Sequence, residues 1–368
     1  MMSQSTPEPY RRGSASPDGP AGGAPRRAGR ASRWGLYLPL IALALIVAAW
    51  SGFWLFARNL VADGLDRAVA EAAARGDAWT CVNRTISGYP FRIEVRCADV
   101  TLTRQASAGV TQFSAGPVLV IGQPHTPNHV VIQARGPLEA RLADGTRIAA
   151  RWDQFEASRR DASGELERLS LDARRPFVTL TAPGGATSTL SAQSLEAHLR
   201  RNPARPAPDQ ARDLFVRVGQ LASGELDALF GDANPSDLDV QITASRSNLL
   251  GQGIAPTALE AWRLAGGSLD LTRVNLRKGI KQVEAKGMLM IDEEKRPAGR
   301  IEPSALNIDQ FAGIRLRGGA MDLASALSGR AAPATPDGLR PLPAIDIRGG
   351  RIGFGPIRLP FGPLAPLY

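Results

Sequence analysis

Cysteine and histidine are scarce in this sequence, and the common catalytic motifs are missing. Its 368 residues include two cysteines and three histidines, His125, His129 and His198. His125 and His129 have the i, i+4 spacing of a helical metal site, but Pro124 and Pro127 exclude the helix that would align both rings. No G-x-S-x-G, P-loop, H-E-x-x-H or strand–helix Rossmann glycine pattern occurs. We therefore expect no enzyme activity, no metal and no cofactor.

Long hydrophobic runs are also few, and a single one is long enough to span a membrane. Leu36 to Ala57 is a stretch of 22 residues without a charged side chain, and a helix needs about 20 residues to cross a bilayer core. Trp34, Tyr37, Trp50 and Trp54 lie near its ends, where aromatic rings favour the headgroup level. We interpret the run as an uncleaved membrane anchor; a cleaved signal peptide and a buried core helix are the alternatives.

Positive charge is distributed unevenly around this run. Six arginines precede it and only one follows it closely: Arg11, Arg12, Arg26, Arg27, Arg30 and Arg33 on one side, and Arg58 on the other. The positive-inside rule then keeps the N-terminus in the cytoplasm and sends residues 58–368 across the membrane. Nucleic-acid binding by the basic tail is the alternative, but the tail lacks the interleaved aromatic residues and the fold of such a site.

Composition divides the chain into four parts. Residues 1–33 are rich in Pro, Gly, Ser, Ala and Arg without apolar periodicity, which predicts a disordered basic cytoplasmic tail. Residues 34–57 are the predicted transmembrane anchor, and residues 58–79 a membrane-proximal helical stem, in which the helix Leu60 to Arg75 is closed by Gly76. Residues 80–368 are predicted to form a periplasmic antiparallel β domain.

Beyond Thr80 the apolar residues recur with a period of two, which is typical of strands with one buried and one wet face. Turn signals separate these stretches at Asp144-Gly145, Gly184-Gly185, Gly266-Gly267 and Gly349-Gly350. The predicted fold class is therefore mainly β, with an antiparallel sheet after the transmembrane helix. The few short helices are expected at Gln210–Leu229, Thr257–Leu264 and Met321–Ser328. The residues predicted to form an apolar row on the concave face, as core or as lipid-facing lining, are Leu138, Leu142, Leu238, Val240, Leu269, Leu271, Leu289 and Ile291.

The two cysteines, Cys81 and Cys97, both lie in the part predicted to be exported. An isolated pair in an oxidising compartment commonly forms a disulfide, and their spacing is not the C-x-x-C pattern of a redox site. We predict a structural disulfide with Cα atoms within about 6.8 Å of each other; two buried free thiols are the alternative.

The cysteines frame the most distinctive segment of the chain, CVNRTISGYPFRIEVRC. In it, Gly88, Tyr89, Pro90, Phe91 and Arg92 are expected to form a turn that precedes a strand. With these residues the sequence resembles the bacterial domain-of-unknown-function family 2125 (DUF2125), in which an N-terminal anchor precedes a Cys…G-[FY]-P-F-[RK]…Cys segment. The likeness continues in order through Trp262–Leu269, Gly287–Asp292, Arg296–Arg300 and Gly355–Leu364. It implies a single-pass protein of the bacterial inner membrane with most of its chain in the periplasm.

The later segments are also similar to the repeat hairpins of AsmA-like envelope proteins. This resemblance implies a long curved antiparallel sheet that forms an open groove with an apolar lining. Two functions are then open: binding of lipid or another amphiphile in a β groove for envelope maintenance, or a structural, scaffolding role that binds a partner protein without lipid. A groove protein should leave its inward apolar rows uncovered, whereas a scaffold should cover them. The proline-rich end, Ile352 to Tyr368, is predicted to lie as an extended lid over one end of the sheet or to dock on a partner.

Overall fold

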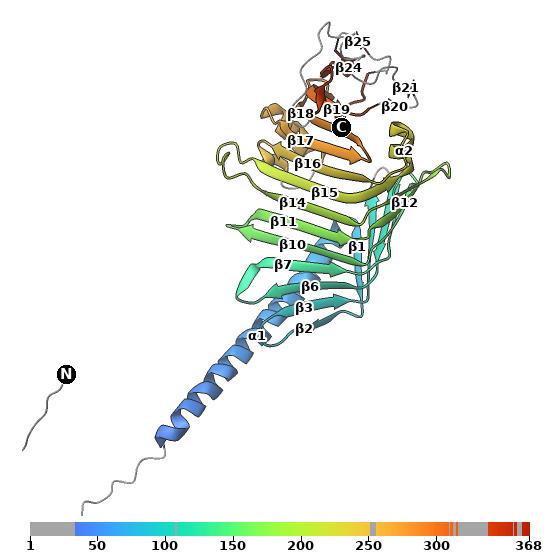
Figure 1. The fold of residues 1–368 in the computed structure, drawn as a ribbon. Coiled ribbons are helices and arrows are strands. Elements are labelled where there is room, and N and C mark those ends of the chain that lie inside the picture. The colour runs from blue at the N-terminus through green and yellow to red at the C-terminus, as the bar shows by residue number, and fades with distance from the viewer. Residues whose placement is uncertain are drawn as a thin grey trace, which may run out of the picture. The chain divides into compact units, whose positions relative to one another are not determined.

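The computed structural model (Figure 1) describes residues 34–106, 109–250, 255–308, 310–311, 314–315, 338–355, 357–358 and 363–368. The chain divides after Trp50 into two units. The described part of the first unit is helical, and the second unit, Ser51–Tyr368, contains the remainder of that helix and all the described strands.

The apolar run and the predicted stem form one continuous helix, α1, from Trp34 to Ala74. Within the described residues it is the one helix long and apolar enough to cross a membrane, which fits a single-pass anchor or a signal sequence. Gly76, with φ of +88°, lies just past its end and leads the chain into the first strand. Because the helix has no break near residue 57, the boundary between anchor and stem stays a prediction.

All described strands except the short pair β20 (Gln310–Phe311) and β21 (Ile314–Arg315) join one antiparallel sheet, which confirms the mainly β fold. A crease divides this sheet into two walls. The short wall contains β1 (Asp77–Val82), β4 (Asp99–Ala106), β5 (Gly109–Ala115), β8 (Leu138–Arg141), β9 (Arg147–Arg151), β12 (Phe177–Thr181) and β13 (Thr187–Ser191).

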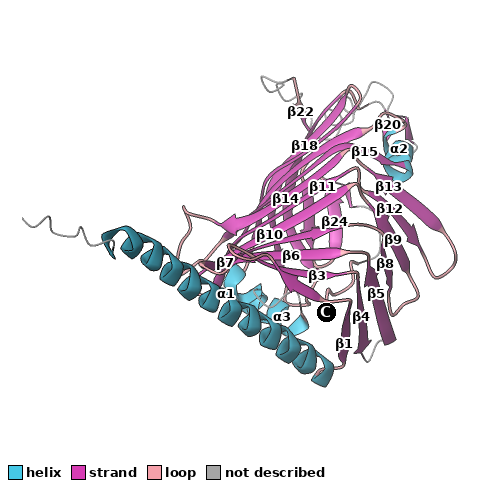
Figure 2. Cartoon of the chain, turned by 90° about the horizontal axis from the view of Figure 1, so that it is seen from below, coloured by secondary structure: helices cyan, strands magenta, loops and turns pink. Residues whose placement is uncertain are grey.

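The long wall begins with β2 (Thr85–Ser87), β3 (Ile93–Cys97), β6 (Val118–Gln123), β7 (Thr126–Ala134), β10 (Gln154–Ala162), β11 (Glu165–Arg174), β14 (Ser194–Arg201) and β15 (Arg212–Ser223). It continues through β16 (Ser236–Ala244), β17 (Leu269–Lys278), β18 (Lys281–Ile291), β19 (Pro297–Leu306), β22 (Arg340–Pro341), β23 (Ile345–Arg348), β24 (Arg351–Phe354) and β25 (Ile357–Arg358). Figure 2 shows the two walls meeting at an angle, with the short wall on the right.

The chain builds both walls together by crossing the crease after every second strand. It passes from β3 to the hairpin β4–β5, back to β6–β7, and so on until β15. Corners at Gly116-Pro117, Gly136-Pro137 and Arg175-Pro176 carry prolines, which lack the N–H that a strand interior would need. Backbone hydrogen bonds such as Gly116 N to Pro137 O (2.9 Å) continue the ladder across the crease. The walls are therefore one sheet bent along a line.

The structure corrects one predicted helix and confirms another. The stretch Gln210–Leu229 was expected to be helical, but most of it is strand β15, and only Gly224–Phe230 forms a helix, α2. Leu214, Val216 and Val218 recur with a period of two and are paired with strands on both sides, so sheet pairing decides the conformation. Helix α3 (Pro256–Leu264) confirms the second predicted helix. Met321–Ser328 lies outside the described residues.

The turn signals are mostly confirmed as hairpin turns. Asp144-Gly145 joins β8 to β9, Gly184-Gly185 joins β12 to β13, and Gly349-Gly350 joins β23 to β24. Gly266-Gly267 instead ends α3 and leads into β17, and a short 3₁₀ turn, η1 (Ser247–Leu250), packs against that helix.

Candidate functional site: an apolar trough between the walls

Cys81 and Cys97 form a disulfide that joins the two walls next to the crease, with Cα atoms 5.2 Å apart. Cys81 is paired with Val100 in the short wall, and Cys97 with Val118 in the long wall. Each sulfur thus lies on the apolar face of its own wall, and the two apolar faces look toward each other. The predicted disulfide is confirmed, and it also defines the inside of the bent sheet.

Three rows of side chains follow the inward face of the long wall. The row nearest the crease contains Cys97, Val118, Ala134, Phe155, Ala173, Leu195, Val218, Leu238, Leu276, Val283 and Ala305. The middle row contains Ile86, Val95, Val120, Ile132, Ala157, Leu171, Ala197, Val216, Val240, Val274, Ala285 and Pro303. At about 4.8 Å between strands, the middle row is about 50 Å long.

The third row lies toward the free margin of the long wall. Its members are Ile93, Gly122, Val130, Arg159, Leu169, Leu199, Leu214, Ile242, Leu271, Gly287 and Ile301. Arg159 interrupts the apolar character of this row and pairs with Asp161 at 2.9 Å.

The short wall presents two matching rows. Its row beside the crease contains Cys81, Val100, Ala115, Leu138, Ala150, Val178 and Leu190, and the next contains Trp79, Leu102, Phe113, Ala140, Ile148 and Leu180. We call the space between the inward faces of the two walls the trough.

Most side chains that line the trough are only half-buried. Leu169 and Ile132 are 40% and 37% exposed, and Trp79 of the short wall is 41% exposed. A fully buried cluster in this region, Phe230 with Ala305 and Ile308, forms where α2 covers the upper end of the long wall. Elsewhere Ile93, Val95, Ala115 and Ala173 are the buried apolar residues of the described inward rows, and the other members lack the burial that a covering layer would give them.

The eight residues predicted from the alternation lie on this inward face or continue its rows. Leu138 belongs to the short wall, with Leu142 just beyond the end of the same strand, and the other six belong to β16, β17 and β18. A β-bulge at Thr272 lets Leu269 and Leu271 share the inward face with Val274 and Leu276, although the two pairs differ in sequence parity. Their lipid-facing role stays a prediction.

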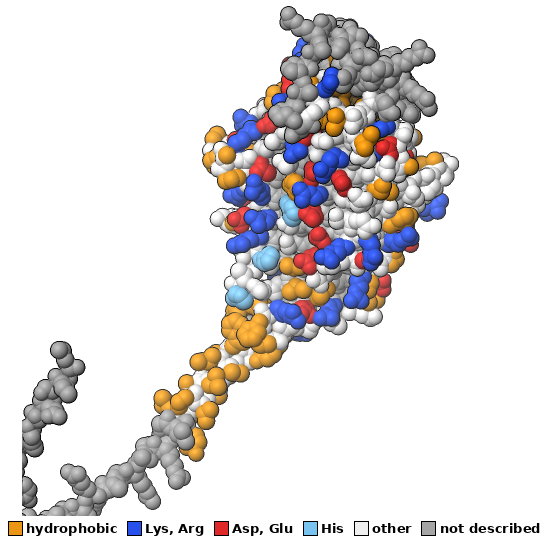
Figure 3. All heavy atoms as spheres, viewed as in Figure 1, with side chains coloured by type: hydrophobic (Ala, Val, Ile, Leu, Met, Phe, Trp, Pro, Cys, Tyr) orange, Lys and Arg blue, Asp and Glu red, His pale blue; other side chains and the backbone are white. Residues whose placement is uncertain are grey.

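The outward face of the long wall is charged. Figure 3 shows basic and acidic side chains mixed over the strands of this face. Cross-strand pairs include Arg217 with Asp239 (2.7 Å) and Arg273 with Glu284 (2.7 Å). A shallow hollow of about 580 Å³ on this face is lined mainly by polar and charged side chains, among them Arg168, His198 and Asp213. The two faces of the wall therefore differ sharply in polarity.

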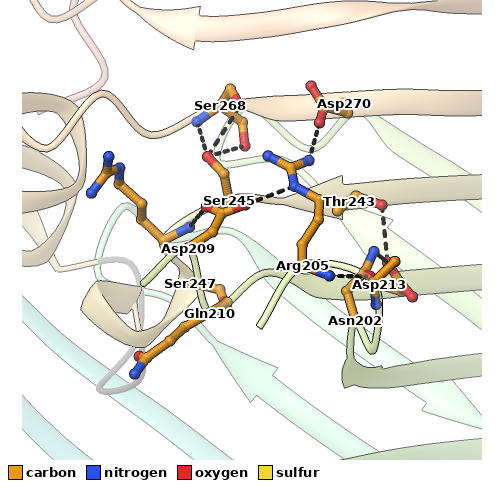
Figure 4. Close-up of polar contacts among 12 residues, drawn as sticks. Asn202, Arg205, Asp209, Gln210, Asp213, Thr243, Ser245, Ser247, Ser268 and Asp270 are labelled. Carbon is orange, nitrogen blue, oxygen red and sulfur yellow. Dashed lines mark hydrogen bonds and ion pairs between the residues drawn. The ribbon is translucent and has the colours of Figure 1, made fainter. Parts of the chain in front are cut away.

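A cluster of polar contacts fastens the loop between β14 and β15 to the margin of the long wall (Figure 4). Arg205 bridges Asp209 (2.7 Å) and Asp270, and Asp213 accepts hydrogen bonds from Asn202 (2.7 Å) and Thr243 (2.9 Å).

Next to it, Ser245 Oγ accepts a hydrogen bond from Ser268 N (2.7 Å), and Ser247 donates to Gln210 O (2.6 Å). The polar groups drawn there are engaged with one another, so the arrangement serves to hold the loop. Among the described residues no group of three or more His, Cys, Asp or Glu side chains could hold a metal ion.

The predicted motif Gly88–Arg92 forms the turn between β2 and β3. Gly88 has φ of +104°, and a Cβ there would lie 2.8 Å from Arg92 O, so the turn needs glycine at this position. The turn contacts α1: Trp54 Nε1 donates to Arg92 O at 2.9 Å, and the rings of Trp54 and Tyr89 meet edge-on at 5.5 Å. The sequence placed Trp54 at the headgroup level but gave no sign of this contact, because the two segments are more than 30 residues apart.

No curated protein and no solved structure matches this chain at a significant level. The AsmA-like resemblance therefore stays a prediction. A family model described as "Uncharacterized protein conserved in bacteria (DUF2125)" matches residues 54–363, which includes the motif turn, both cysteines and nearly the whole folded sheet. The chain belongs to the DUF2125 family.

Proposed function

We propose that this protein is anchored in the bacterial inner membrane by α1, and that its periplasmic sheet binds a lipid or another amphiphile in the trough. The observation that carries the proposal is the uncovered inward face. Rows of apolar side chains about 50 Å long are costly to leave in water, at roughly 25 cal/mol per Å² of apolar surface. An apolar surface of this extent on a soluble domain is typical of a binding surface.

The direction of the trough supports the same function. Its lower end lies at β1 and β2, beside the second half of α1: Arg58 Nε approaches Ile86 O at 3.4 Å, and Gly76 O accepts from Gln105 N at 3.2 Å. Its upper end is where α2 packs on β17–β19. An acyl chain that left the membrane beside α1 would meet apolar side chains along the whole length of the sheet.

The test is native mass spectrometry of the full chain purified from membranes in mild detergent. Wild-type protein is expected to carry lipid. Leu169→Asp puts a charge on the inward face, where the side chain is exposed enough to avoid a folding defect, and should remove most of the bound lipid. Ser170→Asp is the matched control, since it puts the same charge on the outward face of the same strand. Folded wild-type protein that never carries lipid would favour the scaffolding role instead.

A further inference from the structure

The turn Gly88–Arg92 presents two aromatic side chains to the outside of the molecule. Tyr89 is 53% exposed and Phe91 is 68% exposed. Large exposed aromatic rings close together on a turn are typical of a surface that contacts an apolar phase. Binding in the trough does not account for the exposure of these rings, because the turn lies at the ends of β2 and β3 that are farther from the crease.

The contacts of the turn determine which part of α1 it lies beside. Tyr89 Oη and Ser51 Oγ are 2.9 Å apart, and Trp54, which is buried, packs against the same turn. Ser51 and Trp54 both belong to the apolar run Leu36–Ala57. At 1.5 Å per residue, they lie about 9 Å and about 5 Å before its end. If α1 crosses a bilayer with this run, the turn is held at the boundary between acyl chains and headgroups.

Neighbouring side chains have the pattern of such a boundary. Phe53 and Phe56 on the same stretch of α1 are exposed. Four arginines lie on α1 just past the apolar run or on the segments that flank the turn: Arg58, Arg84, Arg92 and Arg96. Glu94 pairs with Arg92 and Arg96, and the hydrogen bond from Arg96 is the main cause that lowers its pKa. Two acidic partners, Glu94 and Asp66, leave this group with net positive charge. Aromatic rings beside arginines that reach toward phosphates are typical of a membrane-interface contact.

We infer that Gly88–Arg92 inserts Tyr89 and Phe91 into the headgroup–acyl boundary of the bilayer that α1 crosses. The turn and the helix are then two points of membrane contact, and together they stop the sheet from rotating about α1. The partner of this surface is the phospholipid leaflet itself. The inference rests on α1 as a membrane anchor and is independent of what the trough binds.

The experiment replaces Phe91 with a benzophenone amino acid in the full chain, reconstituted in nanodiscs of phosphatidylethanolamine and phosphatidylglycerol. The same probe at Leu45, which lies in the apolar run, reports whether α1 is inserted in the bilayer. The same probe at Ile280, a 76% exposed residue in the β17–β18 turn, is the matched control for an exposed apolar position. After irradiation, mass spectrometry counts lipid adducts, and a non-reducing gel checks that the Cys81–Cys97 bridge has formed.

We expect lipid adducts at position 91 to approach those at position 45 and to exceed those at position 280 at least tenfold. If the probe at position 45 forms lipid adducts but the probe at position 91 forms no more than the probe at position 280, the inference is overturned and the membrane anchor stands. Adducts at 91 to a second protein chain in place of lipid would overturn it as well. Absence of lipid adducts at both 45 and 91 would refute the anchor and the inference together.

Discussion

The indole ring of Trp262 occupies the space into which any side chain at Gly267 would project. A Cβ at Gly267 would lie 2.2 Å from Trp262 Cε2. The ring is buried, and its Nε1 donates to Ser245 O at 2.7 Å, which fixes the end of α3 against the loop after β16. This contact explains why the segment Trp262–Leu269, which resembles the DUF2125 family, has a glycine five residues after its tryptophan.

Gly267→Ala is therefore expected to destabilise the protein by about 1–3 kcal/mol, the usual cost of overpacking. Urea unfolding of the full chain in detergent measures it. Gly184→Ala, in a hairpin turn where a Cβ would meet nothing within 4 Å, is the control and should change little. Equal effects of the two substitutions would contradict the packing account.

Cys97→Ser is expected to lower the free energy of unfolding by about 3 kcal/mol, because the bridge closes a loop of about 15 residues. The bridge also ties the two walls at the crease. Reductant should lower the stability of wild-type protein to the level of the variant and leave the variant unchanged. A wild-type protein insensitive to reductant, with two thiols that alkylate without reduction, would show that no bridge exists.

Lys278→Met is expected to cost about 1–3 kcal/mol, because it leaves hydrogen-bonding groups without their buried cation. The Lys278 side chain is 1% exposed and its Nζ contacts Asp227 (2.5 Å) and Asn234 O (2.6 Å), which holds α2 over the upper trough. Thermal unfolding compares it with Lys286→Met, an exposed lysine of the next strand. No difference between the two variants would mean that α2 is held by apolar packing alone.

Acid is expected to weaken the docking of the C-terminus. Tyr368 Oη donates to Glu260 (2.6 Å), and hydrogen bonds from Arg263 first and Tyr368 second lower the pKa of Glu260 to about 2. A carboxylate with a lowered folded-state pKa stabilises the fold fully above its ordinary value of 4.5 and loses that contribution as the pH falls toward 2.

The difference in unfolding temperature between wild type and Glu260→Gln should therefore shrink from pH 4.5 to pH 2. A difference that stays constant over this range would contradict the ion-pair account. The described residues 363–368 dock on the chain itself through Leu367 N to Lys295 O (2.8 Å) and Tyr368 to Glu260. The predicted extended lid is wrong for the first part of the run that begins at Ile352, because residues 351–354 and 357–358 pair as strands β24 and β25.

An alkaline phosphatase joined after Tyr368 is expected to be active, and a cytoplasmic reporter at the same place inactive. The reason is the excess of arginine before the apolar run. Activity assays of the two fusions in intact cells measure the orientation. The reverse pattern would place the sheet in the cytoplasm, where the disulfide would not persist.

Residue alternation was enough to predict which side chains share a face within a strand such as β16 or β18. It was not enough for β17, where the bulge at Thr272 changes which residues, odd- or even-numbered, face inward. A bulge inserts one extra residue into a strand, and alternation alone cannot locate that residue. The cysteine pair could be predicted from its number and compartment. The crease could not, because Gly116-Pro117 and Gly136-Pro137 resemble ordinary turns until strand pairing across them is known. The Trp54–Tyr89 contact, too, depends on tertiary structure alone.

The regular crossings of the crease mean that chain length sets trough length. Successive passages from the long wall to the short wall occur at Ala98, Gly136 and Arg175, at intervals of 38 and 39 residues, and each adds two strands to both walls. At about 4.8 Å per strand, one such interval extends the sheet by about 10 Å without altering its cross-section. Insertion or loss of a whole interval would thus change the length of the trough in steps of two strands per wall, while its lower end beside the second half of α1 stayed the same.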